Sequence, residues 1–588
     1  MTTRSRAGST RLFGVLALIL SSPAMAGEEP EPQPLDGASF TWTGFYVGAQ
    51  LGGLTNFADI TDPLGPSIFS NPNIAPGPFA GVQAGYDYQS GNVVYGIEAE
   101  IAFPQTEGTS TCSSLSGSFI NSNCKIGIDT LGALTGRIGL ALGPDGRTLV
   151  YGKAGAAWYT GSLDLATNDS TTGDAGNPFA TGSNGLSSWG WTLGAGAEYA
   201  LPGNWSVKAE YDYANFGDQS VTLLPSAVIA GSGAVVGIVP ARRGAVSSEL
   251  HAFKLGLNYR FGVSAPPRGD LAHLSLKDDA APALHRFGLD LGSRYWHSWG
   301  RHKYDLGLGT SDPVVSYSLV SRLTYDDVEA STGEMTARVS APWSLFAKGL
   351  LGAGAIHNGH MNDEDFNIEG DSVARIPYTN TISSRVTGDI PSYGTIDIGY
   401  DVWRAPAHRV GAYVGYNYYR ETMGAYGIEQ IANPRGPFGS AEGGGFPPIG
   451  HAIIEQEATW QSLRLGAAGE FYLTPRLKLS GDAAWLPYTS VNATDTHFGG
   501  NTPVIASINP LNGHGVGTQL EAMLSYDVTD QLSIEVGARY WAMWTTDASF
   551  VRTFDAADEV VTPTSPPQHL KIETERVGVL VGATYKFY

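Results

Sequence analysis

Apolar and polar residues alternate with a period of two along most of the chain. In residues 190–200 every second residue is apolar, and residues 205–213 repeat the pattern. A period of two indicates a β-strand with one apolar face and one polar face. Comparable stretches recur from about residue 40 to residue 262 and again from residue 285 onward. The pattern predicts an all-β protein with two runs of strands.

The spacers between strands of the first run alternate between short and long. The short spacers lie at residues 90–92, 143–147 and 202–204, and the long ones near residues 55–77, 104–127, 165–187 and 217–247. Short turns on one side and long loops on the other are typical of an outer-membrane barrel. The run counts eight strands, an even number that returns the chain to its starting side.

The same rhythm in the second run predicts ten strands. Short spacers lie at residues 341–343, 404–408, 473–476 and 527–531, and long ones near residues 300–315, 358–392, 422–451, 488–513 and 545–567. The last strand, residues 576–588, alternates apolar residues up to Phe587, with Tyr588 after it. An aromatic-ended strand of this kind makes the barrel-assembly machinery an expected partner.

Residues 263–284 separate the two runs and contain Pro266-Pro267. Such breakers predict a linker, here periplasmic. We therefore predict two antiparallel transmembrane β-barrels in tandem, over residues 40–262 and 285–588. A single fused barrel of about eighteen strands is the alternative, and the strand-like end at Phe261-Gly262 argues against it.

The first residues predict export. Arg4, Arg6 and Arg11 precede an apolar run at residues 12–20, and Ala24-Met25-Ala26 resembles a cleavage site. Residues 1–26 are thus expected to be a signal peptide and residues 27–39 a short periplasmic segment. No later stretch offers 18 consecutive apolar residues, so an exported protein of this pattern is expected in the outer membrane.

Composition narrows the class further. The chain has 588 residues, of which 76 are glycine, 11% are aromatic and 15% are charged. These values exclude a disordered acidic chain and a coiled coil. Removing the three arginines of the signal segment changes the net charge from −21 to −24, which argues against a nucleic-acid partner.

The polar face of the first run carries charges of both signs: Glu98, Glu100, Arg137, Lys153, Glu198, Lys208, Glu210 and Lys254. In a closed eight-stranded barrel these side chains would point inward and pair. In a soluble β-sandwich, the alternative, they would face water. The two cysteines, Cys112 and Cys124, are predicted to form a disulfide in an oxidising compartment. They are too few for a structural zinc site.

The first run resembles a known family. Residues 42–48 (WTGFYVG), 190–199 (GWTLGAGAEY) and 253–261 (FKLGLNYRF) are similar to the opacity-like, OmpA-like outer-membrane immunogenic proteins of alphaproteobacteria. The resemblance implies an eight-stranded barrel with surface-exposed loops. It implies no enzymatic activity.

The second run resembles the omptins, ten-stranded outer-membrane endopeptidases. The similar stretches include residues 320–323 and 415–420, and above all 362–366 (NDEDF) and 495–497 (DTH). Omptins carry an Asp-x-Asp pair on one wall and an Asp-x-His pair on the other. The resemblance thus implies a catalytic site of Asp363, Asp365, Asp495 and His497 that hydrolyses peptide bonds.

The spacing of these residues fits that chemistry. Residues two apart on a strand point to the same face, so each pair would face the lumen together. The pairs are predicted just past the third and the seventh of ten strands, nearly opposite each other at the extracellular rim. His497 would accept a proton from the attacking water, Asp495 would orient the imidazole, and Asp363 and Asp365 would hold the water.

Two metal sites are weaker alternatives. Asp363-x-Asp365-x-Asn367 begins like a calcium loop, but Ile368 stands where that loop requires glycine. His357 and His360, near Asp363, could bind zinc, although they lack helical spacing. We expect no metal and no cofactor.

The sequence also departs from the omptins. Gly300 and Ala493 fall at two positions where those enzymes have acidic specificity residues. We therefore expect either that a small or apolar substrate residue is accepted at the cleavage point or that the activity is lost. Omptins also require lipopolysaccharide, and Tyr416 and Arg420 match lipid-contacting positions, with Tyr418 in place of an acid. The resemblance implies that outer-membrane lipid and a peptide or protein substrate are partners. Plain anchoring at the membrane interface would explain the same two residues.

Two other functions stay open. The protein could be a non-catalytic surface protein whose barrels present loops, or a weak porin.

Overall fold

A computed structural model of the chain describes residues 40–65, 73–115, 120–143, 145–167, 180–229, 235–261, 287–307, 319–368, 376–405, 408–432, 452–499, 504–550, 553–554, 562–563 and 568–587. The expected signal peptide (1–26), the segment 27–39 and the linker 263–284 lie outside the described residues. Within the described part, no helix has the length and apolar character needed to cross a membrane.

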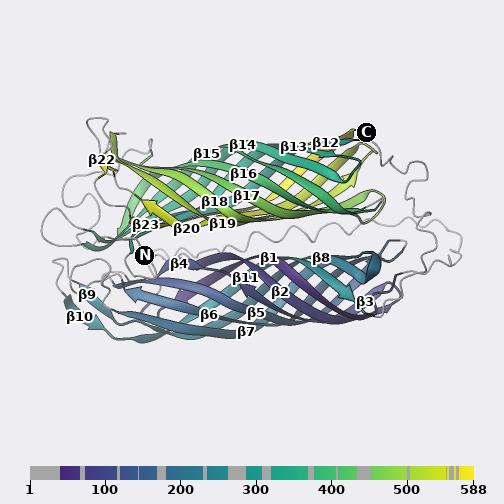
Figure 1. The fold of residues 1–588 in the computed structure, drawn as a ribbon. Coiled ribbons are helices and arrows are strands. Elements are labelled where there is room, and N and C mark those ends of the chain that lie inside the picture. Colours follow the sequence, from purple (N-terminus) through teal and green to yellow (C-terminus); the bar gives the residue numbers. More distant parts are fainter. Residues whose placement is uncertain are drawn as a thin grey trace, which may run out of the picture. The chain divides into compact units, whose positions relative to one another are not determined.

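Eight strands of the first half form a closed antiparallel ring, called barrel 1 (Figure 1). They are β1 (Gly44–Thr61), β2 (Asn73–Ser90), β3 (Val93–Pro104), β5 (Ile120–Leu142), β6 (Thr148–Thr167), β7 (Thr181–Ala200), β8 (Trp205–Leu223) and β11 (Arg242–Arg260). The ring closes where β11 pairs with β1, with Tyr46 opposite Arg260. Short β4 (Gly108–Leu115) lies along β5, and β9 (Ser226–Ile229) pairs with β10 (Val235–Val239). A single 3₁₀ turn, η1 (Pro202–Asn204), joins β7 to β8.

Ten strands of the second half form a second closed ring, called barrel 2. They are β12 (Gly288–Gly307), β13 (Leu319–Ser340), β14 (Leu345–Ile368), β15 (Ile376–Ala405), β16 (His408–Ala432), β17 (Ile454–Tyr472), β18 (Leu477–Gly499), β19 (Val504–Asp527), β20 (Leu532–Phe550) and β23 (Gln568–Phe587). Leu289 on β12 lies opposite Phe587 on β23 at the closure. Two short strands extend this sheet: β21 (Thr553–Phe554) pairs with β19, and β22 (Thr562–Pro563) pairs with β21. The two rings confirm the predicted all-β fold of eight and then ten strands, and they contradict the fused eighteen-strand alternative.

The long spacers are much shorter than the sequence predicts. Residues 358–392 were expected as a loop, yet β14 continues to Ile368 and β15 begins at Ile376. Similarly, residues 488–513 belong mostly to β18 and β19. Cross-strand pairing satisfies the backbone polar groups wherever two strands run together. Strands can therefore continue into water, where the outer face is polar and the apolar outward alternation that marked them is lost.

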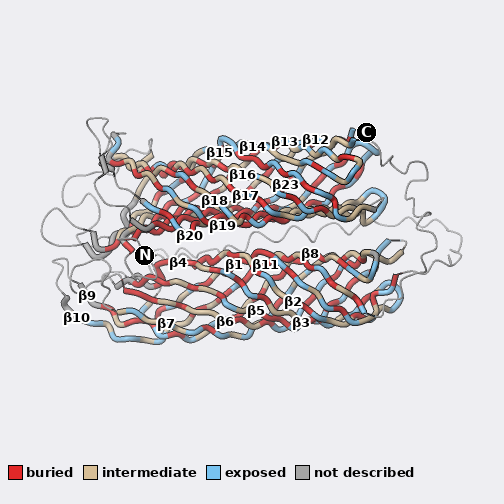
Figure 2. The backbone as a smooth tube through the Cα atoms, viewed as in Figure 1, coloured by how far each residue is buried: buried red, intermediate tan, exposed pale blue. Residues whose placement is uncertain are grey.

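Buried and exposed residues alternate along the strands of both barrels (Figure 2). Large apolar residues cover the outer face, such as Trp189 at 69% exposure and Leu351 at 74%. On β23 the outward residues are Val577, Val579, Val581, Tyr585 and Phe587, all exposed. An apolar outer band of this kind faces lipid in an outer-membrane barrel.

The interior of barrel 1 is a network of ion pairs. Lys208 Nζ lies 3.0 Å from Glu98 Oε1, and Lys153 Nζ lies 2.7 Å from Glu210 Oε1. All eight charged residues singled out in the sequence point inward and are paired: Glu98, Glu100, Arg137, Lys153, Glu198, Lys208, Glu210 and Lys254. The soluble-sandwich alternative is thereby contradicted, because these side chains line a closed interior rather than facing water.

The predicted disulfide is present. Cys112 on β4 is bonded to Cys124 on β5, and their Cα atoms are 5.6 Å apart. The described part of the chain has no free cysteine.

Two layers of side chains, one of paired charges and one of packed aromatic rings, cross the interior of barrel 2. Near the short turns, a cavity of about 160 Å³ is lined by charges of both signs that are paired with one another. Among them, Arg294 Nη1 lies 2.9 Å from Glu521 Oε1 and Arg464 Nη1 lies 2.9 Å from Asp397 Oδ2. Above this layer, Trp296 and Trp541 pack with ring centroids 5.4 Å apart. These two layers argue against the open channel of a porin.

Candidate functional site

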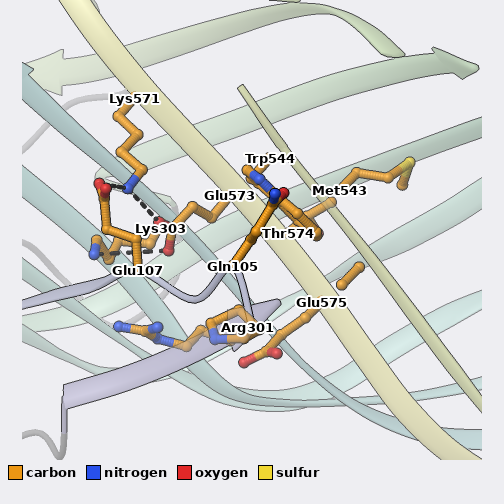
Figure 3. A pocket seen from close by; sticks show the side chains of 12 residues that line it. Gln105, Glu107, Arg301, Lys303, Met543, Trp544, Lys571, Glu573, Thr574 and Glu575 are labelled. Atoms are coloured by element: carbon orange, nitrogen blue, oxygen red, sulfur yellow. Dashed lines mark hydrogen bonds and ion pairs between the residues drawn. The ribbon is translucent and has the colours of Figure 1, made fainter. Parts of the chain in front are cut away.

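The candidate site lies at the end of barrel 2 where β12, β14, β16, β18 and β20 finish, called the distal end. On β18 the outward apolar run stops at Trp485 and Tyr488, each 54% exposed, and polar side chains follow. The outer wall is also charged near this end, where Lys303 Nζ lies 3.7 Å from Glu573 Oε2 and Lys571 Nζ lies 3.4 Å from Glu573 Oε1 (Figure 3). The distal end therefore stands outside the membrane-spanning band.

Asp495 and His497 form a hydrogen-bonded pair on β18. His497 lies nine residues beyond Tyr488, or roughly 30 Å of extended strand. Its Nε2 atom lies 2.6 Å from Asp495 Oδ2. Asn509, the cross-strand partner of Asp495 on β19, donates a hydrogen bond to the same oxygen at 3.3 Å. Asp495 is buried, whereas the His497 side chain is 34% exposed, so a solute can reach the imidazole while the carboxylate stays fixed.

Asp363 and Asp365 lie on β14, four strands away from β18 around the ring. Burial, together with the negative charge of Asp365, raises the pKa of Asp363 well above its ordinary range, while the charge of His497 acts in the opposite direction. On His497 burial lowers the pKa, but Asp495, Asp363 and Asp365 outweigh it and raise the pKa to about 9. The two pairs thus act on each other across the lumen.

The structure corrects one part of the predicted site. All four residues were placed just past the ends of their strands, but they lie within β14 and β18. Strand pairing holds both pairs more firmly than loops would, because each residue has hydrogen-bonded strands on either side.

Two tyrosines that the sequence did not single out lie near enough to both pairs for their charges to act on them. Tyr304 on β12 and Tyr325 on β13 both point into the lumen and are buried. The Tyr304 hydroxyl interacts with the Asp495 carboxylate, and the charges of both Asp495 and Asp363 act on Tyr325. The inward-facing residues of β12 are Trp296, Ser298, Gly300, His302 and Tyr304. This alternation could have shown from the sequence that Tyr304 faces the lumen. Its nearness to Asp495 depends on how the strands close into a ring.

Below the pairs, the lumen holds a buried ion pair. Arg576 Nη2 lies 3.5 Å from Glu421 Oε2, and His302 Nδ1 lies 3.4 Å from Glu421 Oε1. A Cβ atom on Gly300 would lie 2.8 Å from Arg576 Cγ. The Arg576 side chain therefore occupies the space that a larger residue at position 300 would need. Ala493 faces the same lumen from β18 and is buried.

Tyr416 and Arg420 lie on the outer face of β16 and not in the site. Tyr416 is 43% exposed, and its hydroxyl donates a hydrogen bond to Gln461 Oε1 at 2.8 Å. Arg420 Nη2 lies 2.9 Å from Glu457 Oε1, with both side chains well exposed. The tyrosine stands in the apolar band, and the arginine stands toward the distal end.

Among the residues whose side chains the structure describes, neither metal alternative brings three ligands together. Asn367 and Ile368 have side chains outside the described set, and His357 and His360 are exposed on β14. Among the described residues, the acidic and histidine groups close enough to share an ion are Glu98, Glu100 and Glu210 of barrel 1. Lysines are paired with each of these three carboxylates, so we interpret the cluster as part of the ion-pair network.

Comparisons with known proteins agree with the architecture of barrel 1. Residues 14–261 match the family model for the outer membrane protein beta-barrel domain. The 31 kDa outer-membrane immunogenic protein of Brucella melitensis biotype 1 is 28% identical over 266 residues, which cover 42% of this chain and 98% of that protein. This chain is therefore an outer-membrane β-barrel protein. A 22 kDa outer membrane protein of Rhizobium leguminosarum bv. viciae is also 28% identical, over 30% of this chain and 65% of its own length.

Solved structures resemble the chain only distantly. The crystal structure of the outer membrane protease OmpT from Escherichia coli has a TM-score of 0.37 and 14% sequence identity. The likeness covers 51% of this chain and 97% of that protein. At this distance it carries no argument about activity, and the chemistry of barrel 2 must be argued from its own residues.

Proposed function

We propose that barrel 2 is an endopeptidase whose site consists of Asp363, Asp365, Asp495 and His497. The observation that carries the proposal is the Asp495–His497 pair at 2.6 Å, facing an aspartate pair whose charges act on the same imidazole. A histidine held by a buried carboxylate is the arrangement of a general base and its orienting group. The distal end would face the outside of the cell, where long peptide substrates have access.

The proposed reaction is direct attack by water on a peptide carbonyl. The imidazole nitrogen that does not contact Asp495, Nδ1, takes one proton from the water as the oxygen bonds to the carbonyl carbon. The C–N bond then breaks, and the proton passes from the imidazolium to the leaving amine. One proton shared by Asp363 and Asp365 lets this pair both accept and donate hydrogen bonds around the water. Asp495 stabilises the imidazolium between the two proton transfers.

The lumen below the pairs indicates what the site accepts next to the cleaved bond. Gly300 and Ala493 contribute no charge, and Arg576 is paired with Glu421. A basic substrate side chain would meet the guanidinium of Arg576 without an unpaired acid to balance it. We infer that small or apolar substrate residues are preferred there.

The outer face suggests how the lipid takes part. An exposed Tyr416 in the apolar band and an exposed Arg420 above it are suited to contact acyl chains and a phosphate group, respectively. Lipopolysaccharide offers both groups, and we infer that it binds here and supports the site. The alternating, aromatic-ended β23 remains the proposed contact for the barrel-assembly machinery.

A non-catalytic role is the second candidate function. Features of barrel 1 favour this role for the first half of the chain. Its interior is filled by paired charges, and its relatives are named outer-membrane immunogenic proteins. Barrel 1 would then present surface loops, while barrel 2 carries the chemistry.

Cleavage of a peptide library tests the proposed function. The refolded full chain is expected to cut peptides in the presence of lipopolysaccharide vesicles, with small or apolar residues beside the cut. D363N, which removes an acid of the aspartate pair at nearly constant volume, should lose most of this activity. A well-folded wild type that cuts nothing across the library, with lipid present, would leave only the non-catalytic role.

The pH dependence follows from the electrostatics of the site. A general base must be neutral, and the pKa of His497 is raised to about 9. We expect kcat/KM to rise about tenfold per pH unit between pH 6 and 8 and to level off near pH 9. D495N removes the charge that raises the pKa of His497 most. The rise of kcat/KM with pH should therefore occur at lower pH in this variant, although its maximal rate falls. A profile that is flat from pH 6 to 9 would exclude His497 as the base.

A further inference from the structure

The hydroxyl of Tyr325 is a buried group of barrel 2 that the proposed reaction leaves unused. Tyr325 lies on β13, and Leu323, two residues before it, lies directly opposite Asp363 on β14. Its side chain is fully buried, and its hydroxyl has no hydrogen-bond partner among the residues that the structure describes. A buried hydroxyl without a partner has lost its hydrogen bonds to bulk water, so such groups usually bind an ordered water.

Carboxylates face this hydroxyl from two walls of the lumen. Asp363 lies on the neighbouring strand β14, one inward position along from Tyr325, and Asp495 lies on β18 across the ring. The charge of Asp495 acts more strongly on Tyr325 than that of any other residue, and Asp363 follows. Together with burial, these charges raise the pKa of Tyr325 well above its ordinary value, so the phenol keeps its proton and acts as a donor.

A bulge in β13 gives Tyr325 its direction. The pairing with β14 shifts between Asp326 and Glu329, and Asp327 adopts a positive φ of 51°. An extra residue in one strand re-aims the side chains beside it. Both Tyr325 and Val328 are therefore buried toward the lumen although they are three residues apart.

We propose that Tyr325 is a further catalytic residue, whose hydroxyl holds the attacking water between the two pairs. The water would accept a hydrogen bond from Tyr325 Oη and donate one to the Asp363–Asp365 pair, which leaves its second proton for His497 Nδ1 and a lone pair for the carbonyl carbon. Tyr325 itself gains and loses no proton. This assignment rests on the proposed endopeptidase function.

Kinetics of Y325F provide the first test. Removing one hydrogen bond to the nucleophile is expected to lower kcat about tenfold to a hundredfold while KM stays within twofold, because the hydroxyl does not contact the rest of the peptide. Y393F is the matched control. Tyr393 is an equally buried tyrosine of barrel 2 that bonds Glu334 and Thr332, and its loss should leave kcat within twofold. Equal kcat values for Y325F and wild type would overturn the assignment.

A crystal structure of the refolded wild type separates this inference from the proposed function. We expect an ordered water within hydrogen-bonding distance of Tyr325 Oη and of a carboxylate oxygen of Asp363, and its absence in Y325F. A dry gap, or the same water in both proteins, overturns the assignment whatever the activity. A water in place in a wild type that cuts no peptide overturns the endopeptidase and leaves Tyr325 as a structural water ligand only.

Discussion

H497A is expected to abolish measurable peptide cleavage, with kcat/KM lower by two to four orders of magnitude. His497 is the exposed base of the site, and general-base catalysis contributes a factor of about 10²–10⁴. Alanine at this position removes the imidazole that takes the proton and leaves Asp495 without its partner at 2.6 Å. The measurement is the initial rate on the best library peptide, with lipopolysaccharide present.

H514A is the matched control for that experiment. His514 is a histidine of the adjacent β19, 53% exposed, whose ring stacks on Tyr488 outside the lumen. Its loss should change the rate less than twofold. Both variants must show the heat-dependent gel shift of a folded barrel. Full activity of H497A would remove the histidine from the mechanism and with it the proposed water activation.

The number of strands could be predicted because lipid imposes a strong pattern. Every outward residue in the band must be apolar, and a closed ring needs an even number of strands when both ends of the chain lie on one side. Trp485 and Tyr488 mark the limit of this rule on β18. Beyond them water replaces lipid, the outward positions become polar, and β18 continues to Gly499 with no pattern that marks it as a strand.

The four candidate site residues could be named from the sequence, but their surroundings could not. Asp495 and His497 are two positions apart, so any strand presents them together. Asn509 reaches Asp495 only through the register between β18 and β19. Tyr325 depends on a bulge at Asp327, and no local pattern predicts that bulge. Contacts between distant segments depend on the register between strands, which the connecting turn sets. The sequence placed residues 488–513 in a loop, so the register between β18 and β19 could not be predicted.

R137A should destabilise barrel 1 by about 3–5 kcal/mol. Arg137 is fully buried, donates to Asp87 Oδ1 at 2.8 Å and to Glu198 Oε2 at 3.1 Å, and lies over the ring of Tyr46. Alanine removes the cation and leaves two carboxylates sharing Arg260, the cation that still contacts both. Uncompensated charge in a closed interior costs far more than a broken pair in water, because no solvent replaces the lost partner.

Urea unfolding of the full chain in lipid vesicles measures this loss, and R147A calibrates it. Arg147 belongs to the same barrel but sits at a short turn, where it pairs with Asp145 at 3.2 Å and both side chains are partly exposed. Water and salt screen such a pair, so its loss should cost less than about 1 kcal/mol. Similar unfolding midpoints for R137A and R147A would mean that water reaches Asp87 and Glu198, and that the interior of barrel 1 is hydrated rather than closed by its own charges.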